Sequence, residues 1–462
     1  FFFKQKTAYE IYQCDWSSDV CSSDLKDFGI FVAKQFRESV SEPSGANLYL
    51  TFGKVMPWTN DVNPPQANTS DVTIYEVWNN MVGGKRLTAN DIRHVVPRFN
   101  WANNTVYTAY DSLTDSRTLK NANTSFYVLT DEFNVYKCIS NNYGSASTSK
   151  PTSTNPSGQF QTSDKYIWKY MYSLSAEDQQ RFLTNSFMPV RTLLADDNTL
   201  QWQVQDAGVD GAIHNVILLN RGSGYTSNSI SVNITGDGLF ANAFATRNTT
   251  TMQLDSITID NKGAKYTYAN VRISSTHGSG ANARAIISPP GGHGVDPLYE
   301  LGGSYLMIDA LIKNQEGGVL SVENDYRQVA IVEDPQNYDD TKTMSNSAVS
   351  QLTTLTMAES SVTTNYYEDE WVYQGSSLAN ATFRGIVAAW DYSNVTIRLS
   401  NVRGVPTSDL LIGNTSTTSR YVNSVQNPDL KPYSGKLLYI DNITPVDRSI
   451  DQNEEFKILL SF

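Results

Sequence analysis

The sequence is poor in the residue types on which most catalytic and metal sites depend. It has 462 residues but only three cysteines and four histidines. The histidines are His94, His214, His277 and His293. They form no HExxH motif or other close pair, which excludes the commonest zinc motifs. The sequence also has no GxSxG nucleophile motif, and the RGSGY stretch at 221–225 lacks the Lys-Ser/Thr pair of a phosphate-binding loop.

Charge and long apolar runs are also scarce. Charged residues make up only 18% of the chain and its net charge is −12, so it offers little to a nucleic-acid backbone. No apolar run approaches the roughly 18 residues of a membrane-spanning helix. Asn, Thr and Ser are abundant instead, together with 26 Tyr and 28 Gly. This composition is typical of a β-rich chain with many turns, and the length suggests about three domains.

The first 25 residues read FFFKQKTAYEIYQCDWSSDVCSSDL. The stretches KQKTAYEI and DWSSDVCSSDL resemble the two ends of a sequencing-library adapter translated in frame. Neither has helical or strand periodicity, and no apolar core of a secretory signal follows Lys4. We therefore expect residues 1–25 to be an artefact and not native protein. Without Cys14 and Cys21 only Cys138 remains, which excludes an intrachain disulfide and is compatible with a reducing compartment.

Two helices are predicted in the first hundred residues. One covers residues 26–40, because apolar side chains recur there at helical spacing. Its predicted apolar face carries Phe28, Phe31, Val32 and Phe36. The second helix is capped by Ser70 or Asp71, runs through Met81 and ends at Gly83.

Strand-like stretches surround these helices. LYLTFG at 48–53 alternates and predicts a half-buried strand. Further strands are predicted in SFYVLTD, FNVYKCIS and KYIWKYMYSLS, and Cys138 in the second of these is expected to be a core residue. Residues 143–164 are rich in Ser, Thr, Gly and Pro and predict a surface loop. SAEDQQRFL predicts a short helix capped by Ser175.

The clearest internal feature is a repeat between residues 213 and 288. Gly222, Tyr225, Thr226 and Val232 recur 41 residues later as Gly263, Tyr266, Thr267 and Ile273. Each copy reads as strand, glycine turn, strand, glycine turn, strand. Gly222 and Gly224 are expected to adopt φ values that other residues avoid. Because two copies are too few for a solenoid, the repeat predicts a compact β module made by duplication.

Two polar clusters could carry chemistry. GGHG at 291–294 could be a metal or catalytic loop, but a turn in which glycines need unusual angles is favoured. In YYEDEW, the acidic residues Glu368, Asp369 and Glu370 could supply a general acid or calcium ligands, but a solvated loop is favoured. This sparse inventory of reactive groups indicates a structural protein and not an enzyme.

Four stretches of the chain together resemble a known family: LYLTFGKVMPW, VVPRFNW, YRQVAIVEDP and SGKLLYIDNITPVDRSIDQNEEFKILLSF. The family is the baseplate wedge subunit, the product of gene eight, of T-even-type contractile-tailed phages. The residues that match its patterns are Thr51, Phe52, Gly53, Pro57, Trp58, Pro97, Arg98, Trp101, Ser434, Gly435, Tyr439, Asn442, Pro445, Asp451, Gln452 and Phe462. The block PPGGHGVDPLYELGG is also similar to longer, marine-type members.

The resemblance implies a mainly β, multidomain fold with a few helices (β-rich α+β) and nested β-sandwich or barrel domains. The expected segments are a core domain starting at 26–205, an inserted duplicated module at 206–295, a core continuation at 296–365, a barrel-like insertion at 366–430, and strands returning to the core at 431–462. It also implies that Trp58 is a packing anchor at the exit of its strand. The family implies no catalytic residues, no cofactor and no metal.

In function, the resemblance implies a structural protein of the virion tail baseplate, assembled in the host bacterial cytoplasm. Such a protein forms a homodimer, links other wedge subunits and peripheral pin proteins during tail assembly and contraction, and binds neither nucleic acid nor membrane. Two other functions stay open. One is a glycan-binding tail-fibre or adhesin-like protein that uses its Tyr- and Asn-rich modules. The other is a β-rich hydrolase, which needs two carboxylates about 5–10 Å apart in one cleft.

Overall fold

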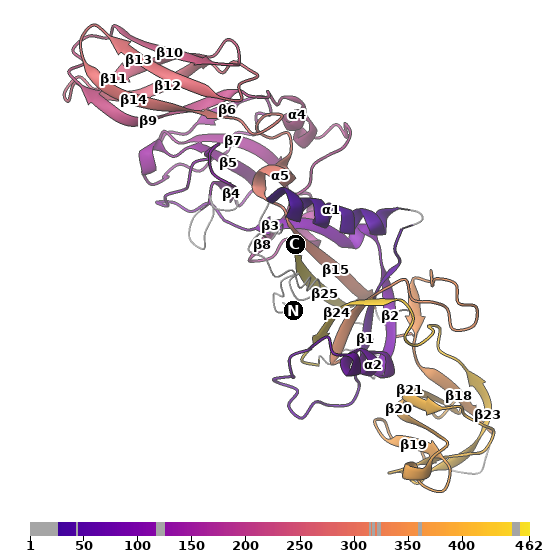
Figure 1. Ribbon diagram of the computed structural model, residues 1–462. Helices are drawn as coiled ribbons and strands as arrows, with labels where there is room; N and C mark the ends of the chain where they lie inside the picture. Colours follow the sequence, from indigo (N-terminus) through magenta and orange to yellow (C-terminus); the bar gives the residue numbers. More distant parts are fainter. Residues whose placement is uncertain are drawn as a thin grey trace. The chain divides into compact units, whose positions relative to one another are not determined.

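The computed structural model describes residues 26–42, 45–116, 125–313, 316, 319–320, 325–358, 363–445 and 453–462. The predicted artefact at 1–25 lies outside the described residues. Strands form 42% of the structure and helices 13%, so the predicted β-rich, multidomain fold is confirmed. The described residues divide into two compact units (Figure 1). Unit 1 comprises 34–92 and 307–461, and unit 2 comprises 26–33, 93–306 and Phe462.

The first helix, α1 (Lys26–Ser41), forms as predicted, but a different face of it is buried. Ile30 and Ala33 are buried, whereas Phe28 and Phe31 are 43% and 57% exposed. Ile30 and Ala33 lie three residues apart and so share a face of the helix. The phenylalanine spacing therefore identified the helix but not its packed side.

Unit 1 is built on an antiparallel sheet in the order β17, β2, β1, β16, β24. The bounds are β17 Ala348–Ser350, β2 Met81–Leu87, β1 Leu48–Gly53, β16 Gln328–Glu333 and β24 Lys436–Asn442. All six residues of β1 are buried, so the expectation of a half-buried strand was wrong. β1 is the central strand and both its faces are covered. Tyr49 packs with Val77 and Trp78, and the ring of Phe52 lies 4.8 Å from that of Phe456.

Helix α2 (Asp71–Asn80) begins as predicted, because Ser70 accepts a hydrogen bond from the backbone N–H of Thr73. The helix ends before Gly83, however, since the chain continues directly into β2. A methyl group on Gly83 would lie 2.7 Å from the carbonyl oxygen of Val349 in β17. Gly83 therefore allows two strands to approach and does not end a helix.

The last strand, β25 (Asn453–Ser461), lies beside β15 (Tyr305–Lys313). Phe456, Ile458 and Leu460 are buried, as their alternation predicts.

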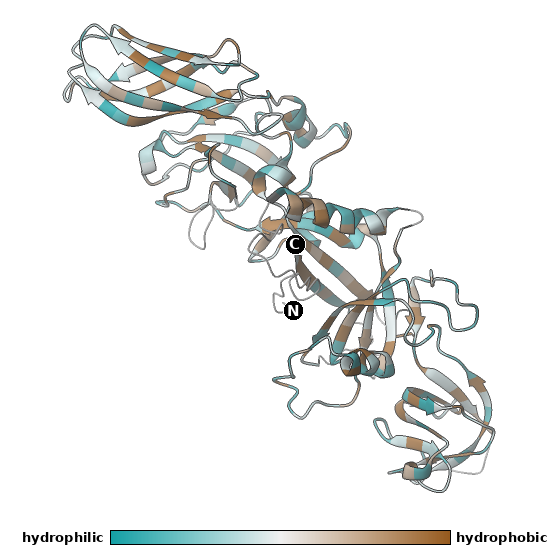
Figure 2. Cartoon of the chain, viewed as in Figure 1, coloured by the Kyte–Doolittle hydropathy of each residue, from teal (hydrophilic) through white to brown (hydrophobic). Residues whose placement is uncertain are grey.

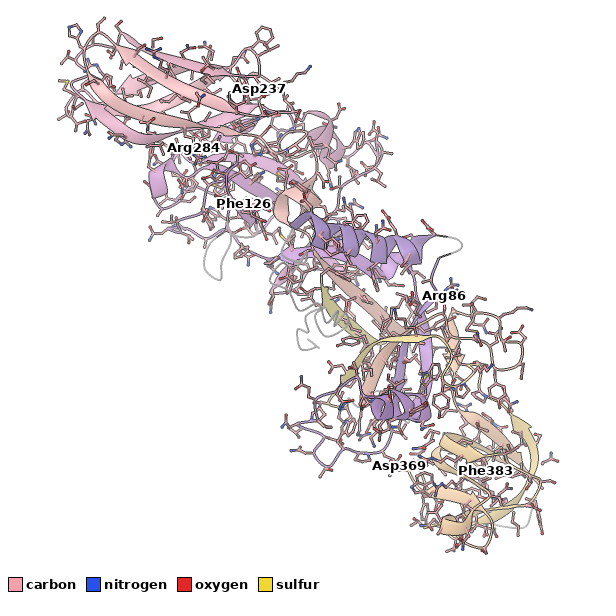
Figure 3. All side chains as sticks on the ribbon, in the orientation of Figure 1. Arg86, Phe126, Asp237, Arg284, Asp369 and Phe383 are labelled. Carbon is pink, nitrogen blue, oxygen red and sulfur yellow. The ribbon has the colours of Figure 1, made fainter. Side chains whose placement is uncertain are left out.

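Unit 1 also contains a closed barrel with Phe383 in its core (Figure 3). Its strands are β18 Thr353–Met357, β19 Trp371–Gln374, β20 Phe383–Asp391, β21 Thr396–Gly404, β22 Leu410–Gly413 and β23 Ser419–Gln426. The barrel thus includes a strand that precedes residue 366.

Unit 2 contains a sheet in the order β4, β5, β7, β6, with Trp168 and Tyr136 fully buried. The bounds are β4 Tyr127–Leu129, β5 Asn134–Ser140, β6 Gln159–Gln161 and β7 Ile167–Ser173. Three of these strands were predicted, whereas β6 lies in the expected loop. Unit 2 also contains β3 Ile92–Pro97, β8 Phe187–Pro189, α3 Ala176–Arg181, α4 Leu200–Asp206, α5 Pro297–Leu301 and the short helix η4 Asn142–Gly144. Two more short helices, η3 Ala89–Asp91 and η6 Leu378–Asn380, belong to unit 1. Ser175 caps α3 as predicted.

The sequence repeat forms a six-stranded sheet in the order β12, β11, β10, β13, β14, β9. The first copy supplies β9 Ile213–Ser223, β10 Ile230–Gly236 and β11 Asn242–Arg247. The second supplies β12 Leu254–Asn261, β13 Ala269–Ser275 and β14 Ser279–Ile287. The first strand of each copy pairs with the last strand of the other copy. Hydrophobic and polar residues alternate along these strands, which buries one face (Figure 2).

The two copies are related by a local two-fold axis. Val232 and Ile273 occupy equivalent positions in the repeat, and they lie opposite each other between β10 and β13. Gly222 and its equivalent Gly263 both have positive φ, 61° and 62°, as predicted for the turn. The duplication is therefore preserved in three dimensions, with exchanged first strands.

Candidate functional site

The sequence stretches that carry the family resemblance meet in the sheet of unit 1. The first stretch forms β1, the third forms β16 and the closing stretch forms β24, and these are neighbouring strands. Leu50 pairs with Ile331, which in turn pairs with Tyr439. Segments nearly 400 residues apart in the chain thus build one continuous core.

Arg327, which directly precedes β16, connects the ends of β1 and β24. Its backbone N–H donates to the Gly53 carbonyl at 3.0 Å, and its own carbonyl accepts from the backbone N–H of Ile443 at 2.9 Å. The same carbonyl accepts from the indole Nε1–H of Trp58 at 3.4 Å. The guanidinium is buried and pairs with Asp61 at 3.0 Å. Arg327 therefore joins its own segment to residues 53–61 and to Ile443, through its backbone and its charge-paired guanidinium.

Asp61 closes the turn that carries Trp58. Its carboxylate accepts the backbone N–H of Trp58 at 2.7 Å as well as the Arg327 guanidinium. Partial burial by itself would raise the pKa of Asp61, but these hydrogen bonds hold it below its usual value. Trp58 is only half-buried, with the Lys54 amine 4.9 Å from its ring centroid, and Pro57 is exposed. That Trp58 is a packing anchor stays a prediction.

The preceding motif residues shape the strand itself. The register of β1 against β2 shifts between Phe52 and Gly53, which marks a bulge. A methyl group at Gly53 would lie 2.4 Å from the Asn80 carbonyl oxygen, so glycine is required by this close approach. The hydroxyl of the buried Thr51 donates to the carbonyl of Ala330 at 3.1 Å.

The second motif belongs to unit 2. Pro97 ends β3, and its carbonyl accepts the hydroxyl of Tyr127 at 2.8 Å. The guanidinium of Arg98 donates to the Thr184 carbonyl at 2.8 Å, in the turn before β8. The indole of Trp101 donates to Ser147 at 3.2 Å. This motif joins β3 to its neighbours within unit 2.

The closing motif stabilises the start of β24. Ser434 donates to the Lys431 carbonyl at 2.6 Å and accepts the backbone N–H of Gln336 at 2.9 Å. Gly435 has a φ of 71°, and a methyl group there would lie 2.4 Å from the Glu333 carbonyl oxygen. These contacts place β24 beside β16.

The other residues of the closing motif lie within β24 and in the segments that follow it. The Tyr439 hydroxyl donates to Asp441 at 3.1 Å, and Asn442 accepts from Gln328 at 2.8 Å. Pro445 is half-buried, and Phe462 follows the end of β25. Asp451 and Gln452 lie outside the described residues.

Unit 2 holds a buried ionic cluster whose contacts were not predicted from the sequence. The amine of Lys137, on β5, lies 2.6 Å from the Glu300 carboxylate and 2.9 Å from Nδ1 of His293. The Lys137 and Glu300 side chains are 0% and 1% exposed. The His214 ring meets the His293 ring edge-on at 4.8 Å, and Lys169 is also buried nearby. The sequence pointed to His293 within GGHG, but not to its contact with Lys137.

This cluster disfavours further positive charge. Burial, and then the charges of Lys137 and other lysines, lower the pKa of His293 far below its usual value. Burial and His293 likewise lower the pKa of His214. The pKa of Lys169 falls to about 8, through burial and the nearby Lys262. The two histidines are therefore neutral at physiological pH.

The GGHG stretch is a turn, as favoured. Gly291, Gly292 and Gly294 all have positive φ, at 82°, 112° and 92°. The turn carries the buried His293 into the ionic cluster.

Cys138 is fully buried, and burial raises the pKa of its thiol well above the usual value, which confirms a core residue.

The YYEDEW stretch differs from the solvated loop that was favoured. Glu370 is buried, and its carboxylate accepts the backbone N–H groups of Thr415 and Ser416, both at 2.8 Å. It also accepts the backbone N–H of Tyr367 at 2.8 Å. Glu370 therefore closes a turn of the barrel, whereas Glu368 and Asp369 are exposed.

Among the described residues, no group of three or more His, Cys, Asp or Glu side chains is placed to hold a metal ion. Within the same residues, no helix has the length and hydropathy to cross a bilayer. The motif residues supply hydrogen bonds and packing to strands and turns. The arrangement they form is a scaffold.

Comparison with known protein families gives a match to part of the chain. Residues 28–143 match the model of the phage family described as Bacteriophage T4, Gp8, a baseplate wedge protein. This confirms the predicted resemblance, over a range that includes the first two motifs. No curated protein matches the chain. The match supports a structural role in a phage tail baseplate, because the family is one of structural baseplate proteins.

Proposed function

We propose that the chain is a baseplate wedge subunit that links neighbouring wedge proteins during tail assembly and contraction. The family match over residues 28–143 carries this proposal. The interlocked core around Arg327 supports it, because a load-transmitting subunit needs distant chain segments held in one sheet. Its partners would be a second copy of itself, other wedge subunits and the peripheral pin proteins, without nucleic acid or membrane, in a virion tail assembled in the host cytoplasm.

The nested modules fit this scaffold as insertions. Ala212 and Ser288 exchange backbone and side-chain hydrogen bonds, so the duplicated module begins and ends at one point. Ser350 and Asp429 are likewise hydrogen-bonded at the two ends of the barrel. The Asp429 backbone N–H donates to the Ser350 carbonyl at 2.8 Å, and the Ser350 backbone N–H donates to the Asp429 carboxylate. The two ends of each module therefore lie close enough for a short linker to replace it.

The proposal is tested by mixing the purified chain with its wedge neighbours and measuring complex formation by sedimentation. A stable complex and a homodimer, with interfaces well above about 2,000 Å², are expected. Two matched deletions sharpen the test: one joins Ala212 to Ser288 by a short linker, and the other joins Ser350 to Asp429. If the core sheet of unit 1 makes the contacts with neighbouring wedge proteins, both deletion variants should still bind them. A strictly monomeric chain that binds no wedge protein at micromolar concentration would contradict the proposal.

A second candidate is glycan binding by the duplicated module. Three aromatic side chains there are well exposed: Phe240 at 78%, Tyr268 at 57% and Phe244 at 50%. Asn242 is also exposed on β11, and aromatic surfaces beside amide groups suit sugar rings. Glycan-array binding by the full chain that disappears in the deletion joining Ala212 to Ser288 would favour this function.

A further inference from the structure

We infer that Lys137 and Glu300 become joined by an amide bond between their side chains. The two groups are 2.6 Å apart at Nζ and Oε2, and both are essentially inaccessible to solvent. They come from β5 and α5 and are 163 residues apart in the chain. The inference does not rest on the proposed function, since it concerns only the buried cluster of unit 2.

The surrounding groups are placed for this reaction. Nδ1 of His293 lies 2.9 Å from the Lys137 amine, where a neutral imidazole can accept a proton from it. The backbone N–H of Gly294 donates to the other carboxyl oxygen of Glu300, Oε1, at 2.6 Å. That N–H is positioned to stabilise negative charge on Oε1 during attack on the carboxyl carbon.

Both reacting groups are withdrawn from solvent, at 0% and 1% side-chain exposure. The Lys137 amine lies 3.9 Å from the ring centroid of Tyr110, which covers it with an aromatic side chain. Burying a charged pair is costly unless every polar group is satisfied, and transfer of a proton from amine to carboxylate removes both charges. Lys169 is also buried in this cluster.

The reaction is balanced without an added reagent. The Lys137 ammonium gives one proton to Glu300, leaving a neutral amine and a carboxylic acid. The amine nitrogen attacks the Glu300 carboxyl carbon while His293 accepts a proton from the nitrogen. The carbon–oxygen bond to Oε2 then breaks, His293 returns the proton, and one water molecule leaves. Two reactants held in contact have a very high effective concentration, which favours such a step.

The decisive measurement is the mass of the purified full chain under denaturing conditions. The inference predicts a mass lower by one water molecule than the sequence gives. It also predicts a branched tryptic peptide that joins the Lys137 and Glu300 segments, with no cleavage after Lys137. An unmodified mass, together with separate linear peptides containing these residues, would overturn the inference and leave an ordinary buried ion pair.

Two variants serve as controls. In Lys137→Arg, neither the water loss nor the branched peptide should occur. In Glu300→Gln, attack on the side-chain amide would release ammonia in place of water, so the same branched peptide should form with a different mass loss from its own unmodified chain. The native chain alone decides the question if either variant fails to fold.

Discussion

Unit 2 should lose stability steeply in mild acid, because two of its buried histidines cannot take up protons while it is folded. His214 and His293 are both buried, and their pKa values in the folded chain lie far below the ordinary value. In the unfolded chain both bind protons below about pH 6.5. The unfolded state therefore binds more protons than the folded state as pH falls, and the folded state loses stability in that direction.

The magnitude follows from linkage. Each such histidine removes about 1.4 kcal/mol of unfolding free energy per pH unit once the pH is well below 6.5. Two of them together should remove about 3 kcal/mol between pH 7.5 and pH 5.5. Above about pH 7.5 their contribution is fully present and no longer changes.

The assay is reversible urea unfolding at pH 7.5, 6.5 and 5.5, followed by tryptophan fluorescence because Trp168 is fully buried in unit 2. His214→Gln should reduce the acid-dependent loss by about half, since one of the two histidines is removed. His277→Gln is the matched control, because His277 is exposed on the duplicated module and its replacement should leave the loss unchanged. An unfolding free energy that stays constant from pH 7.5 to 5.5 would refute the reasoning.

Three further changes test the packing of unit 1. Phe52→Ala should lower the unfolding free energy by about 3–5 kcal/mol in urea, because its ring is fully buried against other aromatic rings. Trp58→Ala should lower the unfolding free energy by about half as much as Phe52→Ala, since Trp58 is half-buried. A loss equal to that of Phe52→Ala would show that Trp58 is a full packing anchor. No loss at all would show that Trp58 does not contribute to the core. Glu370→Gln should destabilise the barrel by about 1–3 kcal/mol in thermal unfolding, because the charged acceptor for the Thr415 and Ser416 N–H groups is lost; an unchanged melting temperature would contradict this.

Local patterns predicted many elements but not how they combine. The alternation in LYLTFG identified β1, yet alternation cannot show whether a strand has one or two covered faces. Here the second face is covered by β25, which begins some 400 residues later. The helix end at Gly83 was misplaced for a similar reason, since a glycine that ends a helix and one that admits a neighbouring strand look the same in sequence.

The candidate site shows the same limit. The family resemblance located the residues that shape β1 and β24, because glycine, proline and tryptophan at fixed spacing are visible in the chain. The partner strands of the duplicated module were not predictable, since either pairing of its first strands satisfies the same alternation. The contact of Lys137 with Glu300 spans 163 residues and depends on the packed structure alone.

The crossed arrangement of the duplicated module has a consequence for how it can change in evolution. Neither forty-residue half can keep its own opening strand, because each lends that strand to the other half. A relative that retained a single copy would have to borrow the missing strand from a second polypeptide. We therefore expect both copies of the duplicated module to be gained or lost together. Where only one copy is kept, we expect the number of subunits to change.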